Sequence, residues 1–300
     1  MELQRRKKKE IALNGGKIVN PRNSFLEWNY DAEIYAFQKR LNESFDNALL
    51  RQSFTHSSYV YEETKKQQAL GINTPLQLLD NRTLAEEGKA LVERFLYGYL
   101  RASLPNLPKE GIQIIQTFLM DPDLHAHIAK HLGMSELILC SVDPPSKEIL
   151  TTCLHAIVSC VNRSSGEDQA RRFVYDFIAV QLADKSVADL WQPVNPMGVL
   201  VDVLQKMGNG EPEPRLIRKT GVNTILATYH VGVYSNKQLI GSAPGESPEI
   251  AEELAARDAL SRLFGIQHEM NPLEFGVYLT DATKQQAVQL ESRPKAQFIS

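Results

Sequence analysis

The sequence predicts two domains, an all-helical domain followed by a small domain with the element order α-β-β-β-α. Three observations support this division. The chain has 300 residues, enough for about two domains. Apolar residues recur at three- and four-residue steps from about residue 26 to residue 190. After a proline-containing segment the spacing changes, and short strand-like runs precede a final helix.

The helical domain is expected over residues 26–190, and capping residues mark where its helices begin and end. Asp121 is well placed as an N-cap, with Pro122 in the first turn, and Gly133 fits the end of the same helix. Ser146 is expected to cap the next long helix. The helical stripes are Ile34, Phe37 and Leu41, with the polar Gln38 among them; Leu91, Phe95, Leu96 and Leu100; and Ile112, Ile115 and Leu119.

A linker is expected at residues 191–196, and the second domain at residues 197–268. The turn signal Ser235-Asn236 separates two of its strands, and Ser247 is the expected N-cap of its last helix. Residues 269–300 are polar and weakly patterned, which predicts a C-terminal tail or an arm that lies on something else. The expected elements are a helix near 199–207, strands at 214–219, 224–233 and 238–242, and a helix at 248–264.

The first 25 residues form a basic extension that suits contact with phosphate. Its core is a run of five consecutive cations, and the start of the chain also contains acids, unlike a typical transit peptide. Any such peptide is expected to have been removed. Because the whole chain has a net charge of -3, this cluster is the plainest candidate for contact with an RNA backbone, although a solvated tail is an equal alternative. The five residues are Arg5, Arg6, Lys7, Lys8 and Lys9.

Two further groups of residues carry weaker signals. The three cysteines have no paired spacing, and we interpret them as reduced, with Cys153 and Cys160 as small buried hydrophobes. His125, His127 and His131 have the appearance of a metal cluster, but they lack supporting ligands, so a solvated helix face is the favoured interpretation. No apolar run is long enough to cross a bilayer.

The first domain resembles the ribonuclease III family. The string Phe54-Thr55-His56-Ser57-Ser58-Tyr59 is similar to a family motif and is fairly specific. Asn81, Leu84 and Gly88 match the register of the family's catalytic stretch, and Ala156-Ile157-Val158-Ser159 sets the frame for its second acidic pair. With this alignment, the positions of the family's metal-binding carboxylates are occupied by Ala85, Lys89, Thr152 and His155.

The resemblance implies hydrolysis of RNA with magnesium held by anionic oxygens, and these four side chains do not supply them. Ala85 offers no ligand, Lys89 is a cation, and His155 suits softer metals. We therefore predict a catalytically degenerate domain that holds no metal and needs no cofactor. An active endoribonuclease that uses Glu86, Glu87 or Glu93 as substitute ligands is the alternative.

The second domain resembles the double-stranded-RNA-binding domain, but the lysine clamp of that family is missing. The clamp would stand at Pro248-Glu249-Ile250-Ala251-Glu252, where acids replace the lysines. Residues 195–265 hold seven Lys and Arg against eight Asp and Glu, which makes the usual mode of duplex binding doubtful. Arg215, Arg218 and Lys219, on a predicted strand, offer another basic edge, with an ordinary exposed strand as an equal alternative.

Order and motifs together closely resemble the ribonuclease-III-like ribosomal proteins of the large subunit of animal mitochondrial ribosomes. That resemblance implies a location in the mitochondrial matrix, with ribosomal RNA and neighbouring mitochondrial ribosomal proteins as partners. Ribonuclease III domains pair through an apolar face, so the resemblance allows pairing as well as a single copy held by other proteins. A free regulator that binds duplex RNA is the third alternative.

Overall fold

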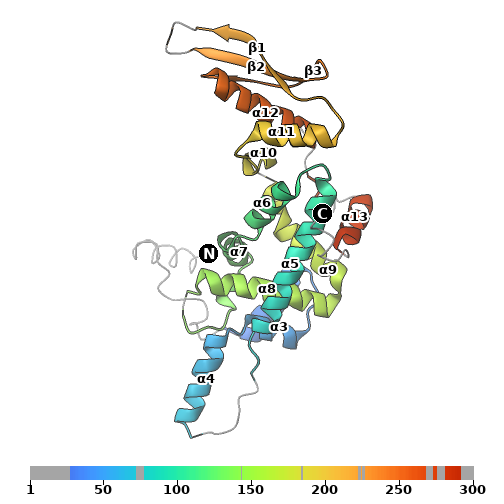
Figure 1. Cartoon of the computed structure of the whole chain (residues 1–300). Coiled ribbons are helices and arrows are strands. Elements are labelled where there is room, and N and C mark those ends of the chain that lie inside the picture. The colour runs from blue at the N-terminus through green and yellow to red at the C-terminus, as the bar shows by residue number, and fades with distance from the viewer. Residues whose placement is uncertain are drawn as a thin grey trace, which may run out of the picture. The chain divides into compact units, whose positions relative to one another are not determined.

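The structure is a computed structural model of the chain, and it describes residues 28–71, 78–142, 144–183, 185–221, 224, 227–267, 273–275 and 281–291 (Figure 1). Contacts group the chain into two compact units. The first consists of the chain up to Glu93 and of Asp121–Val174, and the second of Arg94–Met120 and the chain from Tyr175 onward. The domain limits predicted from sequence patterns are not tested by this grouping and stay predictions. In the described part of the chain, no helix combines the length and apolar character needed to span a membrane.

The first unit is helical, as predicted. Its long central helix α8 packs against α7 and α3, and its interior face is almost entirely buried. The helix α4 extends from this group with no buried residue (Figure 1). The elements are α2 (Tyr30–Leu41), α3 (Asn47–Phe54), α4 (Ser57–Ala69), the first part of α5 (Arg82–Ser103), α7 (Pro122–His131), η2 (Met134–Glu136), α8 (Lys147–Ser165) and most of α9 (Glu167–Phe177).

Local capping explains where two of these helices begin. The Asp121 carboxylate accepts a hydrogen bond from the Asp123 amide at the start of α7, and Pro122 occupies the first turn. Ser146 Oγ accepts from the Ile149 amide at the start of α8. Gly133 has a φ of 75° just beyond α7, a backbone conformation that favours glycine. All of these local predictions are confirmed.

The second unit contains the predicted α-β-β-β-α region. The strands form one antiparallel sheet in the order β1-β2-β3, with a bulge in β1 between Leu216 and Arg218. The predicted second strand was too long at its start, because pairing begins only at Thr228. The elements are the last part of α5, α6 (Lys109–Leu119), η3 (Ala179–Leu182), α10 (Val187–Leu190), α11 (Pro196–Lys206), β1 (Glu213–Thr220), β2 (Thr228–Ser235), β3 (Gln238–Gly245), α12 (Pro248–Phe264) and α13 (Asp281–Glu291).

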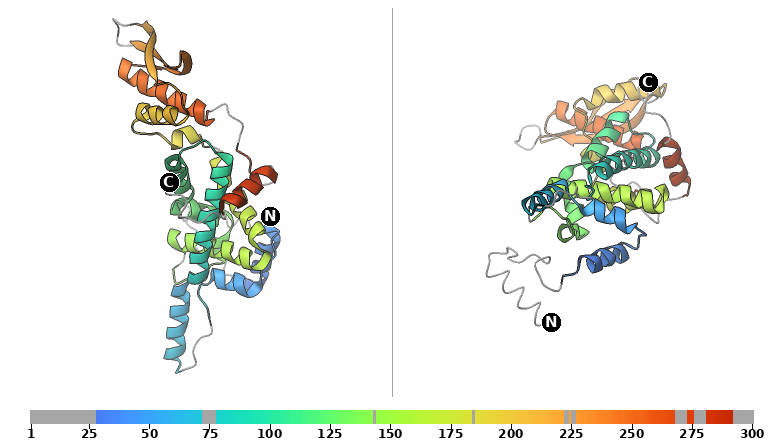
Figure 2. Two further views of the ribbon diagram at one scale, coloured as in Figure 1. Left: turned by 45° about the vertical axis from the view of Figure 1, so that its right-hand side comes forward. Right: turned by 90° about the horizontal axis from the view of Figure 1, so that it is seen from below.

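Helix α12 lies directly on one face of the sheet, mainly over β3 and β2, and the views of Figure 2 agree on this. Small residues permit the close approach. A Cβ at Gly241 would lie 2.5 Å from the Ala259 nitrogen, and one at Gly245 would lie 2.6 Å from the Ala251 nitrogen. The sheet contributes Val231 and Val233 to the core, both almost completely buried. On α12 itself, Ala251, Ala255, Ala256, Ala259 and Leu260 are all buried, whereas Leu263 is partly exposed.

Residues predicted as linker and tail also enter the second unit. Trp191 is buried and its ring packs on Phe264 of α12, with ring centroids 5.5 Å apart. The Tyr99 hydroxyl donates to the Glu274 carbonyl at 2.7 Å, and the Tyr99 ring also contacts Phe275. These aromatic contacts anchor two segments for which sequence patterns had indicated no secondary structure.

Candidate functional site

Helices α5 and α8 meet at the place where the sequence alignment puts the catalytic positions. Gly88 lies against the backbone of His155, so that a Cβ at Gly88 would come within 1.8 Å of the His155 carbonyl oxygen. Only glycine allows this approach. Ala85 is buried with Leu84 and Ala156 in one apolar cluster. The backbone geometry therefore brings the two halves of the catalytic pattern together.

The four positions that the sequence alignment assigns to metal-binding carboxylates present no anionic oxygen, because they are Ala85, Lys89, Thr152 and His155. Ala85 is 7% exposed and contributes a methyl group to the core. Lys89 is exposed, and it is near enough to His155 for its charge to lower the pKa of that imidazole. Thr152 uses its hydroxyl within α8, donating to the Glu148 carbonyl at 2.8 Å. The site therefore contains a methyl group, an ammonium group, a hydroxyl group that already has a hydrogen-bond partner, and an imidazole, but no carboxylate among these four side chains.

His155 is held in the interior by a second histidine. His125 Nδ1 of α7 and His155 Nε2 lie 2.9 Å apart, and the rings meet edge to face. One nitrogen must donate and the other accept, so two fully protonated rings cannot form this bond. Burial, the neighbouring His125 and the Lys89 charge together lower the pKa of His155 to about 3. His155 is thus a neutral, buried cross-link between α7 and α8 at neutral pH.

This contact corrects the interpretation of the three histidines as a solvated helix face. His125 is completely buried, whereas His127 and His131 are exposed and contact each other at a centroid distance of 4.2 Å. The signal was present in the sequence, because His125 precedes Ile128 and Ala129 by three and four residues and so shares their apolar face. The partner of His125, on another helix, was not visible in the sequence.

Asn81, the residue that begins the catalytic stretch, has a structural role. It is completely buried, and its Nδ2 donates to the Ser53 carbonyl at 3.1 Å and to the Cys153 sulfur at 3.3 Å. These bonds tie the start of α5 to α3 and α8. Cys153 and Cys160 are buried free thiols, as predicted, and burial raises the pKa of both.

The acids considered as substitute ligands do not gather around this site. Glu87 is ion-paired with Arg163 of α8, whose Nε donates to it at 3.0 Å. Glu86 is exposed, and Glu93 is partly buried and has contacts of its own. Throughout the described ranges, no three His, Cys, Asp or Glu residues are close enough to hold a metal ion together. The geometry offers magnesium no set of hard ligands.

In the second unit, the surface that would face duplex RNA is acidic. Ser247 caps α12, and Glu249, Glu252 and Glu253 occupy its first turns. Hydrogen bonds from its own backbone amide and from Ser247 lower the pKa of Glu249, which fixes its negative charge there. A phosphate approaching this end would meet carboxylates in place of lysines.

The candidate basic edge lies on β1, where all eight residues are exposed. Arg215 donates to Glu213 at 2.6 Å and lies over the Tyr234 ring, so part of its charge is already neutralised. Arg218 and Lys219 follow the bulge and face solvent. The other candidate cluster, Arg5, Arg6, Lys7, Lys8 and Lys9, lies outside the described residues.

Comparison with known families matches both parts of the chain. Residues 29–161 match the endonuclease domain of large ribosomal subunit protein mL44, and residues 191–297 match the MRPL44 dsRNA-binding domain. The chain belongs to the mL44 family. Large ribosomal subunit protein mL44 of Caenorhabditis elegans is 32% identical over 255 residues, which cover 83% of this chain and 63% of that protein. The chain therefore spans a little under two thirds of that relative's length.

More distant similarities extend to ribonucleases. Ribonuclease 3 of Enterococcus faecalis is 28% identical over 73% of this chain and 91% of its own length. Among solved structures, the nuclease domain of ribonuclease III from Campylobacter jejuni superposes with a TM-score of 0.40, at 21% identity, over 51% of this chain and 96% of that one. Membership in the mL44 family confirms the resemblance read from the motifs, including the order of the two domains.

Proposed function

We propose that this chain is a structural component of the large subunit of the mitochondrial ribosome, located in the matrix, where it binds ribosomal RNA and neighbouring proteins without cutting RNA. The single observation that carries the proposal is the filled catalytic position between α5 and α8. There, Ala85 packs in an apolar cluster and His155 bonds to His125, so two of the positions expected to carry metal-binding carboxylates supply no anionic oxygen. Membership in a family of large-subunit proteins supports the ribosomal part.

Loss of cleavage follows from the electrostatics of this position. Magnesium needs several hard oxygen ligands. The positive charge of Lys89, which lies near His155, would repel the ion here. A slip of register that made Glu87 a ligand would break its ion pair with Arg163 and would leave Thr152 and His155 unchanged. The endoribonuclease alternative therefore requires several rearrangements at once.

RNA contact is assigned in this proposal to the two basic clusters instead of the α12 surface. The cluster from Arg5 to Lys9 has the charge density for contact with a phosphate backbone, and Arg218 and Lys219 are exposed on β1. The acids at the start of α12 argue against the third alternative, a free regulator of duplex RNA. Pairing of this chain with a second ribonuclease-III-like domain, through its own helical domain, also stays a proposal.

Sedimentation of the tagged full chain from gently lysed mitochondria tests the ribosomal role. With magnesium present, the protein should migrate with the large ribosomal subunit, and chelation should release it only when the subunit itself falls apart. A pool that stays at the top of the gradient under both conditions would contradict the proposal. Such a pool, if it bound duplex RNA through residues 195–265 alone, would favour the free regulator.

A further inference from the structure

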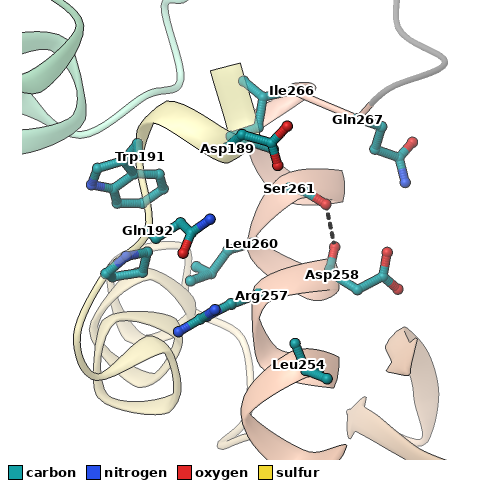
Figure 3. Close-up of a pocket in the computed structure, with 12 residues that line it drawn as sticks. Asp189, Trp191, Gln192, Leu254, Arg257, Asp258, Leu260, Ser261, Ile266 and Gln267 are labelled. Atoms are coloured by element: carbon teal, nitrogen blue, oxygen red, sulfur yellow. Dashed lines mark hydrogen bonds between the residues drawn. The ribbon is translucent and has the colours of Figure 1, made fainter. Parts of the chain in front are cut away.

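The second unit contains a surface pocket of about 310 Å³ that none of the activities considered so far uses (Figure 3). One wall is α12 and the other is the segment that carries Trp191 and Gln192. Its volume is near the lower end for small-ligand pockets, roughly 300 Å³, so it suits one or two side chains better than a large cofactor. The lining residues used below are Asp189, Gln192, Leu254, Arg257, Asp258 and Ile266.

Arg257 is the unusual member of this lining. Its Nε is buried and has no hydrogen-bond partner, and no ion pair of its guanidinium occurs among the described residues. Figure 3 shows its side chain reaching from α12 toward the segment with Gln192. Charged groups in folded proteins are seldom left partly buried without a partner, so a half-buried arginine with no ion pair among the described residues indicates that its partner comes from outside the chain. The fork of a guanidinium matches a carboxylate in shape and charge.

The other charges of the pocket leave Arg257 available. The Asp258 carboxylate accepts hydrogen bonds from the Ser242 amide and from Arg262 Nε, both at 2.9 Å. Asp189 is exposed and lies near Ile266 in Figure 3, and no ion pair joins it to Arg257 in the part of the chain that the structure describes. Asp258 is thus engaged elsewhere, and Arg257 lies beside the exposed apolar side chain of Leu254, with Asp189 as the other charged residue of the lining.

We propose that this pocket, the Arg257 pocket, binds an Asp or Glu side chain, together with an adjacent apolar residue, from a neighbouring protein of the large subunit. The carboxylate pairs with the charged guanidinium of Arg257, and the apolar neighbour covers the exposed Leu254 side chain. The protein source rests on the proposed function. A stretch of RNA fits less well, because its regularly spaced phosphates need several cations and this lining supplies Arg257 alone, enough for a single carboxylate.

Site-specific crosslinking in assembled particles tests the proposal. The photoreactive residue p-benzoylphenylalanine replaces Gln192, an exposed residue of the lining, in the tagged full chain, and large subunits are isolated and irradiated. The expected product is a crosslink to a protein, within a peptide that contains Asp or Glu next to an apolar residue. Adding Arg257→Gln should lower the yield about tenfold, the loss expected for an interfacial arginine.

A structural role of Arg257 would give a different pattern. Because Arg257 has no partner among the residues that the structure describes, Arg257→Gln should leave the melting temperature of the free protein unchanged, whereas loss of an internal contact would lower it. Lys206→Gln on α11 removes the same charge from the same unit away from the pocket and should leave the crosslink intact. Arg257→Lys, which keeps the charge without the fork, should give an intermediate yield and covers the case in which the glutamine variant folds poorly.

The outcomes separate the two proposals. Failure of the unsubstituted tagged chain to enter the large subunit would overturn the ribosomal role itself. Entry into the subunit with a crosslink to RNA, with no crosslink, or with a yield that Arg257→Gln does not change would overturn the Arg257 pocket alone.

Discussion

Two helix contacts in this molecule are built in the same way and differ in what surrounds them. Between α5 and α8, Gly88 lets the helix backbones touch beside His155. Between the sheet and α12, Gly241 and Gly245 let the helix lie directly on β3. In both places glycine sets the backbone distance, and in both the sequence predicts that the residues for binding metal or phosphate are missing.

The difference between the two contacts concerns burial. At the α5–α8 contact, two of the four predicted site positions belong to the core, because Ala85 packs among apolar residues and His155 bonds to His125, whereas Lys89 is exposed. At the start of α12, the replaced residues remain on the surface as Glu249 and Glu252. On the proposed function, packing and charge together oppose metal binding at the first contact, whereas charge alone opposes phosphate binding at the second, so surface substitutions should change the second more easily.

The largest effect is expected from Gly88→Ala. The new methyl group would collide with the backbone of His155, which cannot move without separating α5 from α8, so the free energy of unfolding should fall by about 3 kcal/mol. Chemical denaturation measures this directly. In the matched change Gly111→Ala, the new methyl group meets only the flexible Leu107 side chain, and the loss should stay below about 1 kcal/mol. Equal losses would mean that the α5–α8 contact is not tight.

The second effect is a loss of stability in acid. His155 has a pKa of about 3 in the folded protein against 6.5 for the free side chain, so the unfolded state binds the proton more tightly. Its contribution to stability is complete above pH 6.5 and declines as the pH falls toward 3. Between pH 6.5 and pH 5 the free energy of unfolding should drop by about 2 kcal/mol, at about 1.4 kcal/mol per pH unit.

Denaturation curves at several pH values for His155→Gln and His127→Gln isolate the buried pair. The first variant should lose most of the acid dependence, and the second, at an exposed position, should keep it. Burial also lowers the pKa of His56, so a shallower dependence of the same sign should persist in His155→Gln. Unchanged acid dependence in His155→Gln would show that the pair is not the cause.

The third effect concerns the surface of α12. The double substitution Glu249→Lys and Glu252→Lys changes the local charge by four and should tighten binding of a short RNA duplex by the full chain about tenfold at low salt. Filter binding over a range of salt concentrations measures the affinity and its salt dependence. Asp202→Lys with Glu211→Lys makes the same charge change elsewhere in the second unit. An equal gain in that control would show that overall charge, not the α12 surface, governs binding.

The smallest effect is expected for Glu87→Gln. The ion pair with Arg163 is partly exposed and screened by solvent, so its loss should cost less than about 1 kcal/mol of stability. Thermal denaturation of Glu87→Gln and Arg163→Gln, singly and together, gives the coupling between the two side chains. A coupling above 2 kcal/mol would mean that the pair is a main link between α5 and α8.

Much of the fold could be predicted because its signals are local. The caps Asp121, Ser146 and Ser247 each bond to an amide two or three residues away, so the sequence alone placed three helix starts. The second strand was extended too far toward its start because its first paired residue, Thr228, is set by a neighbouring strand. Pairing across strands is a tertiary property that a local pattern shows only in part.

The candidate site was predictable in its composition but not in its contacts. Alignment of motifs gave Ala85, Lys89, Thr152 and His155, yet the bond between His125 and His155 joins residues 30 positions apart on two helices. Burial of Trp191 against Phe264 was missed for the same reason, since prolines nearby suggested a linker. Contacts of this kind depend on how helices pack, which periodicity within one helix does not specify.

A magnesium-dependent cleavage assay on the purified full chain tests the central claim most directly, namely that the fold has been kept without the catalytic chemistry. Duplex RNA is incubated with the protein at increasing magnesium concentrations, and Glu87→Gln is run in parallel. The account predicts no cleavage above that of buffer at any concentration, for either protein. Cleavage that rises with magnesium and disappears in Glu87→Gln would show that the chain is an endoribonuclease with substitute ligands.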